Sequence, residues 1–372
     1  MQVMDQKTSI TSNEFQPGGL SHFDIKSLLG EKSIDWDPIK KKFSTGPEEF
    51  EELLFKIHYK RKRPLAAAER SNVLHFLSIG YLSTDDVRYF NEFLWFYTEE
   101  ETDRTLMEQC MERFNGNVNE IGHHKQPAQF KNYPFTINTR DADQPNEKKG
   151  SLRICLIGFP PFFGSMIKDL KKEGHHVEQF FLPYHPSRRI SQFLKLKLPV
   201  KLLSLASGNT YPYRTLNFDR KDERIGRVLR EGNFDIGFHK LNFIIKENIF
   251  GAFKRGLLND HWGYLPLLRG KSTISYSVLL NIPVIPTIHF INEGIDSGPI
   301  TGYYPCDYSK AKNVKGIRDI LRKTLPARAV SAIKCAGNSS FIPKENKKEA
   351  GLTFYEIHPW LDGHIASRIF KQ

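Results

Sequence analysis

Amide, imidazole and carboxylate side chains occur in this sequence at a spacing that can bring them into one site. Residues 256–270 read GLLNDHWGYLPLLRG, so Asn259 and His261 are two residues apart. Alternate residues of a strand point to the same face of a sheet, so these two side chains face the same way. Asp296 follows His261 by 35 residues, in a loop flanked by glycines. An amide can donate to a developing oxyanion, an imidazole can move a proton, and a carboxylate can orient the imidazole or accept a proton.

These residues lie where strand-like and helix-like segments alternate, which predicts a doubly wound, mostly parallel α/β sheet. The expected strands are 153–158, 176–182, 234–241, 256–259 and 285–290. The expected helices are 166–173, 246–254 and 272–280. Ligands in such sheets bind beyond the C-terminal strand ends. That rule selects the segments after Ile157, Leu241, Asn259 and Phe290.

The part before this sheet is predicted to be a helical domain over residues 47–116, preceded by an irregular N-terminus at 1–46. One helix opens at Pro47 and stops at Pro64, and a second covers 65–79 and ends at Gly80. A capping box of Ser83 and Asp86 opens the third, and Asn115-Gly116 closes a fourth over 102–114. Residues 117–150 are polar and are interpreted as a linker.

The α/β domain is expected to cover residues 151–308, and residues 309–372 a C-terminal helix with a short appendage. The helix is expected at about 314–336, and 351–360 can add a strand and a closing element. Neither a repeat nor a low-complexity block interrupts this order.

The composition excludes several classes of protein. Twenty-eight Phe and 14 Tyr allow a real core, which excludes disorder throughout. Lys and Arg number 54 against 42 Asp and Glu, a net charge of +12. This charge favours anionic partners, such as nucleic acid, nucleotides or polyglutamylated small molecules, or is a generally basic surface. The N-terminus lacks an apolar signal segment and no apolar run is long enough to span a bilayer, so a cytoplasmic protein is expected.

Several common motifs are absent from the sequence. The turn 158–164, GFPPFFG, is not a dinucleotide fingerprint, and the sequence has neither a P-loop nor a G-x-S-x-G elbow. The four cysteines form no CxxC pair, which argues against a zinc framework and fits a reducing compartment. His123 and His124 have no further ligand at a metal-binding spacing, so no metal is expected.

Three sequence pieces together resemble the folate-dependent formyltransferase family. They are the opening RICLIGFPPF at 153–162, the N-x-H followed by L-P-x-x-R-G at 259–270, and T-x-H-x-x-x-x-G-x-D-x-G-P-I at 287–300. Their order and the spacing of His261 and Asp296 match the family, over about residues 151–308. The family includes enzymes that act on initiator tRNA, on a purine precursor and on sugar nucleotides, and related formyltetrahydrofolate hydrolases. Its fold is a Rossmann-like α/β core.

The resemblance implies transfer of a formyl group from N10-formyltetrahydrofolate to an amine, without a metal. Asn259, His261 and Asp296 match the family's catalytic trio: Asn259 and protonated His261 would stabilise the oxyanion, and Asp296 would assist His261. The folate would lie against residues Phe290, Ile291, Asn292, Glu293, Gly294 and Ile295. Substrate contacts are expected from Phe159, Pro160, Trp262, Gly263 and Arg269.

Some positions depart from the family pattern or allow two interpretations. Trp262 replaces a small residue, and its ring either lines the acceptor pocket or packs under the loop. Asn292 stands where an acidic residue is common, and His289 is interpreted as structural. Arg269 either anchors a turn or contacts substrate. Four arginines between residues 183 and 222 either meet an acceptor phosphate or are solvated; they are Arg188, Arg189, Arg214 and Arg220.

The expected acceptor is an amino-sugar nucleotide, an anionic substrate that fits the basic charge. About 64 residues follow Tyr308, which is short for the tRNA enzyme's barrel, so tRNA is disfavoured. Other amines, a hydrolase, and a non-catalytic binding protein on the same scaffold remain alternatives, and a homodimer remains open.

Overall fold

The structure is a computed structural model that describes residues 23–30, 34–61, 63–121, 150–182, 200–216, 223–241 and 243–369. Residues 122–149 of the predicted linker 117–150 lie outside the described residues, as do the arginines Arg188, Arg189 and Arg220, whereas 117–121 belong to a helix. The chain divides into two compact units, residues 1–116 and 117–372.

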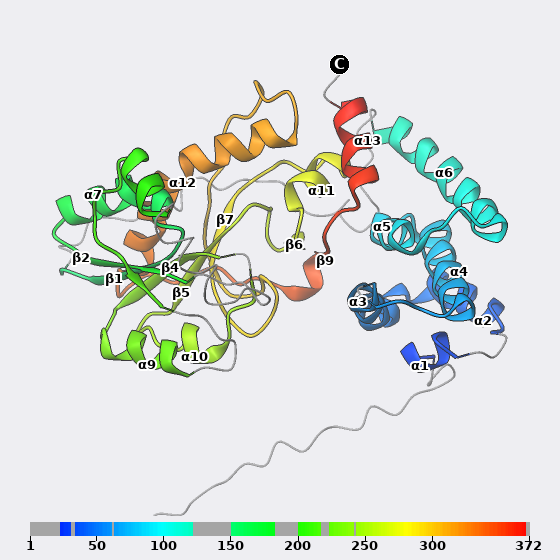
Figure 1. Cartoon of the computed structure of the whole chain (residues 1–372), viewed down its shortest axis with the longest axis horizontal. Helices are drawn as coiled ribbons and strands as arrows, with labels where there is room; N and C mark the ends of the chain where they lie inside the picture. The colour runs from blue at the N-terminus through cyan, green and yellow to red at the C-terminus, as the bar shows by residue number, and fades with distance from the viewer. Residues whose placement is uncertain are drawn as a thin grey trace, which may run out of the picture. The chain divides into compact units, whose positions relative to one another are not determined.

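The second unit contains a seven-stranded sheet of the expected α/β type (Figure 1). Its strands are β1 (Arg153–Gly158), β2 (His176–Phe181), β3 (Arg214–Thr215), β4 (Ile236–Lys240), β5 (Leu257–His261), β7 (Thr287–Phe290) and β8 (Ile300–Tyr303). The spatial order is β3-β2-β1-β4-β5-β7-β8. The first five strands in this order are mutually parallel. Strand β7 runs antiparallel to its neighbours β5 and β8, so the sheet is mostly parallel, as predicted. A separate pair joins β6 (Leu268–Gly270) to β9 (Leu352–Phe354).

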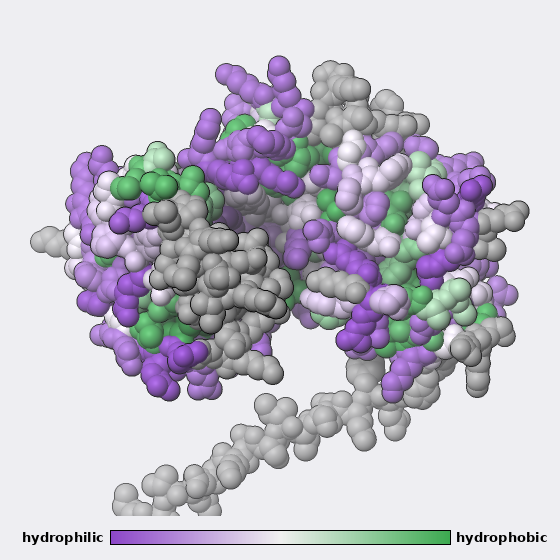
Figure 2. Space-filling model, in the orientation of Figure 1, coloured by the Kyte–Doolittle hydropathy of each residue, from purple (hydrophilic) through white to green (hydrophobic). Residues whose placement is uncertain are grey.

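Helices cover both faces of this sheet because successive strand residues, which point to opposite faces, are apolar. One face buries Leu156, Phe238 and Leu258 against α7 (Gly164–Lys172) and α12 (Val314–Ala336). The other buries Cys155 and Leu257 beneath α9 (Arg224–Glu231) and α10 (Glu247–Phe250). Figure 1 shows these helices on opposite sides of the strands, and Figure 2 shows hydrophilic residues over the outer turns of α12.

The helix α12 has the predicted bounds, but it is part of the α/β core. Leu325, Ala329 and Ile333 of this helix are buried in the same apolar cluster as Leu156 of β1. The expected domain boundary at residue 308 therefore cuts through a continuous core and is wrong. The predicted helix 246–254 is also too long, since α10 ends at Phe250.

The remaining elements of this unit are short or terminal. They are η4 (Pro160–Phe162), α11 (Thr273–Leu279), η5 (Lys348–Ala350) and α13 (Pro359–Ile369). The strand expected within 351–360 is β9, and the closing element is the start of α13, which continues beyond this range.

The first unit is helical, as expected. Its elements are α1 (Ile25–Leu28), α2 (Asp37–Thr45), η1 (Pro47–Phe50), α3 (Glu51–Lys60), α4 (Ala67–Thr84), α5 (Val87–Phe96) and α6 (Glu101–Ile121). Residues 1–46 are not irregular throughout, because Leu28, Ile39 and Phe43 anchor α1 and α2 in the apolar core. No helix among the described residues is long and apolar enough to cross a membrane.

Three helix boundaries in this unit differ from the prediction. Gly80 does not end α4: a Cβ atom there would come within 2.5 Å of the Tyr89 ring, so this glycine allows close packing. Asp86 caps α5 by accepting from the Arg88 amide at 2.9 Å, and a capping box opened by Ser83 is wrong. The α6 helix continues through Asn115-Gly116 to Ile121.

Candidate active site

Three polar side chains lie in one row across the sheet near the C-terminal end of β5. The strand register pairs Asn259 with His239 of β4 on one side and with His289 of β7 on the other. Register partners on adjacent strands share a face, and strands are spaced about 4.8 Å apart. His239 and His289 are both buried, and Asn259 between them is half-buried.

Asn259 joins this row to Asp296, which comes from the loop between β7 and β8. The Asn259 Nδ2 lies 3.2 Å from His289 Nε2 and 3.4 Å from Asp296 Oδ1. His289 Nδ1 must carry a proton, because it lies 2.8 Å from the Phe290 carbonyl oxygen, which can only accept. His289 Nε2 also lies 3.4 Å from Asp296 Oδ1, so this nitrogen faces both the Asn259 amide and the carboxylate.

His261 approaches Asp296 from the end of β5. Its Nε2 donates to the Leu268 carbonyl at 2.7 Å, and its Nδ1 lies 3.3 Å from Asp296 Oδ2. The same Oδ2 accepts from the Gly270 amide at 2.9 Å. Glycine is required at 263, because a Cβ atom there would lie 2.7 Å from His261 Nε2. The predicted trio therefore converges, and both nitrogens of His261 face acceptors.

Electrostatics keep the Asp296 carboxylate ionised. Burial opposes the charge, but His261 and His289 reverse this and lower the pKa of Asp296 well below its usual range. Burial lowers the pKa of His261, and the Asp296 carboxylate opposes that shift. With Nε2–H fixed on Leu268, a neutral His261 turns the Nδ1 lone pair toward a carboxylate oxygen. Proton uptake at Nδ1 converts that repulsion into an ion pair, which partly offsets the effect of burial on His261.

The Asp296 loop is held by residues from the C-terminal part of the chain. Asn346 Nδ2 donates to the Asp296 and Gly298 carbonyls, both at 2.9 Å. Asp296 itself has a left-handed backbone with φ of 46°, a conformation that costs energy in a non-glycine residue. The loop contacts therefore fix the carboxylate in an otherwise unfavourable conformation.

Asp260, between the two site residues of β5, points to the opposite face and binds α12. Its carboxylate accepts from Arg328 Nε at 2.7 Å and Lys240 Nζ at 2.8 Å, and from the Trp262 indole at 2.6 Å. Burial alone would raise the pKa of Asp260, but Lys240 and Arg328 hold it well below its usual range. This buried cluster anchors the strand that carries Asn259 and His261, and sequence reasoning missed it.

The Asp260→Asn variant is expected to be destabilised by about 3–5 kcal/mol, since it leaves Lys240 and Arg328 buried without a counter-charge. Urea unfolding of the full chain measures the loss. Asp319→Asn removes a carboxylate that pairs with Lys315 and Arg322 on the exposed side of α12, and should leave the unfolding midpoint close to that of wild type. Equal stability of the two variants would contradict the anchoring role.

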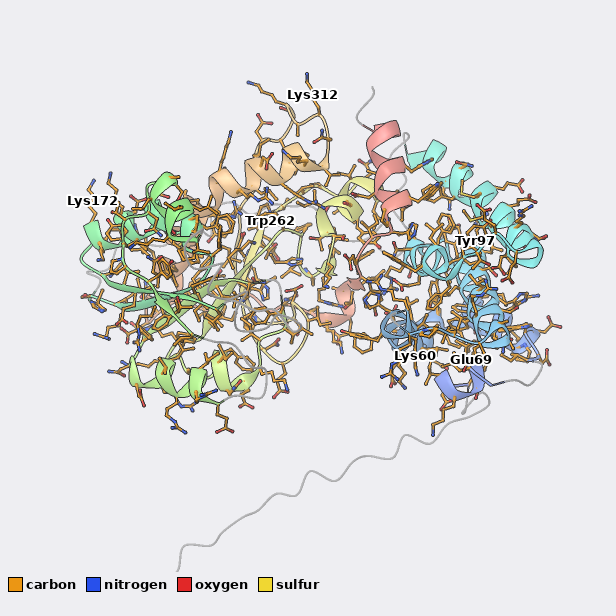
Figure 3. All side chains as sticks on the ribbon, viewed as in Figure 1. Lys60, Glu69, Tyr97, Lys172, Trp262 and Lys312 are labelled. Atoms are coloured by element: carbon orange, nitrogen blue, oxygen red, sulfur yellow. The ribbon has the colours of Figure 1, made fainter. Side chains whose placement is uncertain are left out.

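Trp262 and Arg269 have protein partners that favour structural roles. The Lys240 ammonium lies 4.2 Å from the centre of the Trp262 ring, which with Asp260 sets this side chain on the α12 side of β5 (Figure 3). Arg269 Nη2 donates to the Lys348 and Gly351 carbonyls at 2.8 and 2.6 Å. Substrate binding by these two residues stays a prediction, as it does for Gly263.

Phe159 and Pro160 follow β1, two strands away from β5. The Phe159 ring packs on Phe162, and the Pro160 carbonyl accepts from Asn209 at 2.6 Å. The structure therefore places them at the same edge of the sheet as the trio, and their contact with substrate stays a prediction.

The predicted folate segment 290–295 comprises Phe290, the last residue of β7, and the loop residues that precede Asp296. Asn292 Oδ1 accepts from the Gly294 amide at 3.2 Å and from Ser297 Oγ at 2.9 Å, so this side chain shapes the loop itself. Among the described residues, no cluster of His, Cys, Asp or Glu has the arrangement of a metal site.

The fold and the site define a Rossmann-like α/β unit with an amide, an imidazole and a carboxylate gathered at the strand ends. The chain is 28% identical over 152 residues to a methionyl-tRNA formyltransferase of Hahella chejuensis, covering 40% of this chain and 46% of that protein. It is 22% identical over 231 residues to the enzyme of the same name from Legionella pneumophila, covering 58% and 71%. The resemblance to folate-dependent formyltransferases is thereby confirmed.

The chain spans about half the length of most of these curated relatives. A solved 4-N formyltransferase from Francisella tularensis is 18% identical, with 59% of this chain and 87% of that chain covered and a TM-score of 0.43. No protein-family model matches the chain.

Proposed function

We propose that the second unit transfers a formyl group from N10-formyltetrahydrofolate to a primary amine. The observation that carries the proposal is the convergence of Asn259, His261 and Asp296 at one sheet edge, in a chain whose curated relatives are formyltransferases. Amine attack on the formyl carbon forms a C–N bond, and the bond from that carbon to N10 of the folate then breaks. The attacking amine loses a proton and N10 gains one.

His261 and Asp296 supply the proton transfer in this scheme. His261 Nδ1 takes the amine proton, and the Asp296 carboxylate stabilises the resulting imidazolium. His261 Nδ1 lies 3.3 Å from Asp296 Oδ2, which is long for a charge-assisted hydrogen bond, whereas Nε2 lies 2.7 Å from the Leu268 carbonyl. Nδ1 is therefore the nitrogen that can more readily leave its protein partner for the amine.

Asn259 contributes to stabilising the tetrahedral oxyanion. Its 3.4 Å contact with Asp296 Oδ1 is weak, and an oxyanion placed nearby is a competing acceptor for the same amide proton. The folate lies against residues 290–295 in this proposal, where the Asn292 side chain is already used within the loop. Main-chain groups of the loop are proposed to contact the pterin.

The acceptor proposed first is an amino-sugar nucleotide, whose diphosphate complements a chain with a net charge of +12. A second candidate is methionyl-tRNA, the acceptor in the names of the curated relatives.

A formyl-transfer assay with both acceptor classes tests the proposal. The purified chain is supplied with N10-formyltetrahydrofolate and either uridine- and thymidine-diphosphate amino sugars or methionyl-tRNA. Appearance of tetrahydrofolate together with a formylated amine is expected. Tetrahydrofolate and free formate without formylated amine would identify a hydrolase. Absence of both turnover and folate binding would identify a non-catalytic protein.

A further inference from the structure

His239 is a buried imidazole beside the predicted trio that the formyltransferase motifs do not include. It lies at the C-terminal end of β4, is 3% exposed, and is the register partner of Asn259. The alternation along β4 turns Phe238 toward the α12 face, so His239 shares the opposite face with Asn259 and His289.

The tautomer of His239 follows from one contact. The Leu241 amide lies 3.3 Å from His239 Nδ1, and an amide nitrogen can only donate, so Nδ1 is unprotonated. Burial lowers the pKa of His239 to about 3, and the Lys240 ammonium adds to this shift, so the ring is neutral at physiological pH. A neutral imidazole carries one proton, which must then be on Nε2.

That proton has no acceptor among the described residues. A buried donor without an acceptor costs about 1–3 kcal/mol, so a folded chain keeps one where a ligand or water supplies the acceptor. The other polar side-chain nitrogens of the cluster have protein partners: Asn259 Nδ2 contacts His289 and Asp296, and His261 Nε2 donates to Leu268. The Nε2 proton of His239 is therefore the buried side-chain donor of this row that lacks an acceptor among the described residues.

We propose that His239 donates a hydrogen bond from Nε2 to the oxygen of the reacting carbonyl, and so adds a neutral donor to the oxyanion-stabilising groups beside Asn259. This role rests on the proposed formyl transfer and extends it to a residue outside the predicted trio. A donor that is already oriented and desolvated needs no rearrangement as charge develops on the oxygen, which is the condition under which such donors are most effective.

Two substitutions separate the donor role from a structural role. His239→Asn places an acceptor near the position of Nδ1, so it can keep the Leu241 contact, but it is too short to replace the Nε2 donor. His239→Gln reaches the position of Nε2 with an amide proton, but it loses the acceptor for Leu241. The donor role therefore predicts that Gln is the more active variant, and a role limited to holding Leu241 predicts the reverse.

The expected result is a kcat about 10²-fold below wild type for His239→Asn, with little change in the KM for N10-formyltetrahydrofolate, and a smaller loss for His239→Gln. Equal activity of the two variants, or a more active Asn variant, would overturn the proposal. An inactive wild-type chain would instead refute the proposed function, and the role of His239 with it.

NMR of the 15N-histidine-labelled wild-type chain gives a readout that does not depend on how the variants fold. The free protein is expected to show His239 with its proton on Nε2, and addition of tetrahydrofolate with a formylated acceptor should shift that signal. A proton on Nδ1, or an Nε2 signal that the ligands leave unchanged, would overturn the proposal.

Discussion

Replacing His261 with alanine is expected to lower kcat for formyl transfer by about 10²–10⁴-fold while the chain stays folded. The substitution removes the group that accepts the amine proton and leaves Asp296 Oδ2 with the Gly270 amide as its remaining partner in this part of the site. The measurement is steady-state formation of tetrahydrofolate with the acceptor that wild type uses.

The matched control is His176→Ala, which removes an exposed histidine of β2 that contacts Glu178 and lies three strands from β5. Its turnover should equal that of wild type. If His261→Ala retains near-wild-type turnover, with an unfolding curve like that of the control, then His261 is not the proton acceptor.

The Asp296→Asn variant is expected to lower kcat by a similar factor, for a different reason. In the wild-type chain each oxygen of the Asp296 carboxylate accepts a hydrogen bond: Oδ2 from the Gly270 amide, and Oδ1 from Asn259. An asparagine supplies only one oxygen, so its NH2 group must face one of these donors. The exposed Asp307→Asn, beyond the end of β8, is the control and should have wild-type kcat.

The same variant has a pH signature. Burial lowers the pKa of His261, and the Asp296 carboxylate partly offsets this shift. Removing the carboxylate charge therefore lets the pKa of His261 fall further. In the proposed mechanism His261 accepts a proton, so the acidic limb of the kcat–pH profile that it sets should move to lower pH in Asp296→Asn. A limb at the wild-type position would show that His261 does not respond to this carboxylate.

The sequence predicted the parts of the site that depend on local geometry. Strand alternation placed Asn259 and His261 on one face, and the glycines around Asp296 indicated a tight loop. The sequence could not predict that one row contains His239, Asn259 and His289, because this row depends on the register of three strands that are distant in sequence. His289 was accordingly interpreted as structural, although its Nε2 contacts Asn259.

Longer-range anchors escaped prediction for the same reason. Asp260 is adjacent to both site residues, but its partner Arg328 follows 68 residues later on α12. Gly80 in the helical unit was predicted to end a helix, because glycine ends many helices. In the structure it instead makes room for the Tyr89 ring. In each case the deciding contact is tertiary.

Residues near the end of the chain complete the seating of Asp296. Asn346 binds the Asp296 carbonyl, and β9 pairs with β6 beside Gly270, whose amide binds the carboxylate. Protein synthesis runs from the N-terminus, and the strands that carry Asn259 and His289 emerge well before these residues. A nascent chain that has reached residue 345 would therefore already carry the imidazoles of His261 and His289. It would still lack the Asn346 contacts that hold the Asp296 loop.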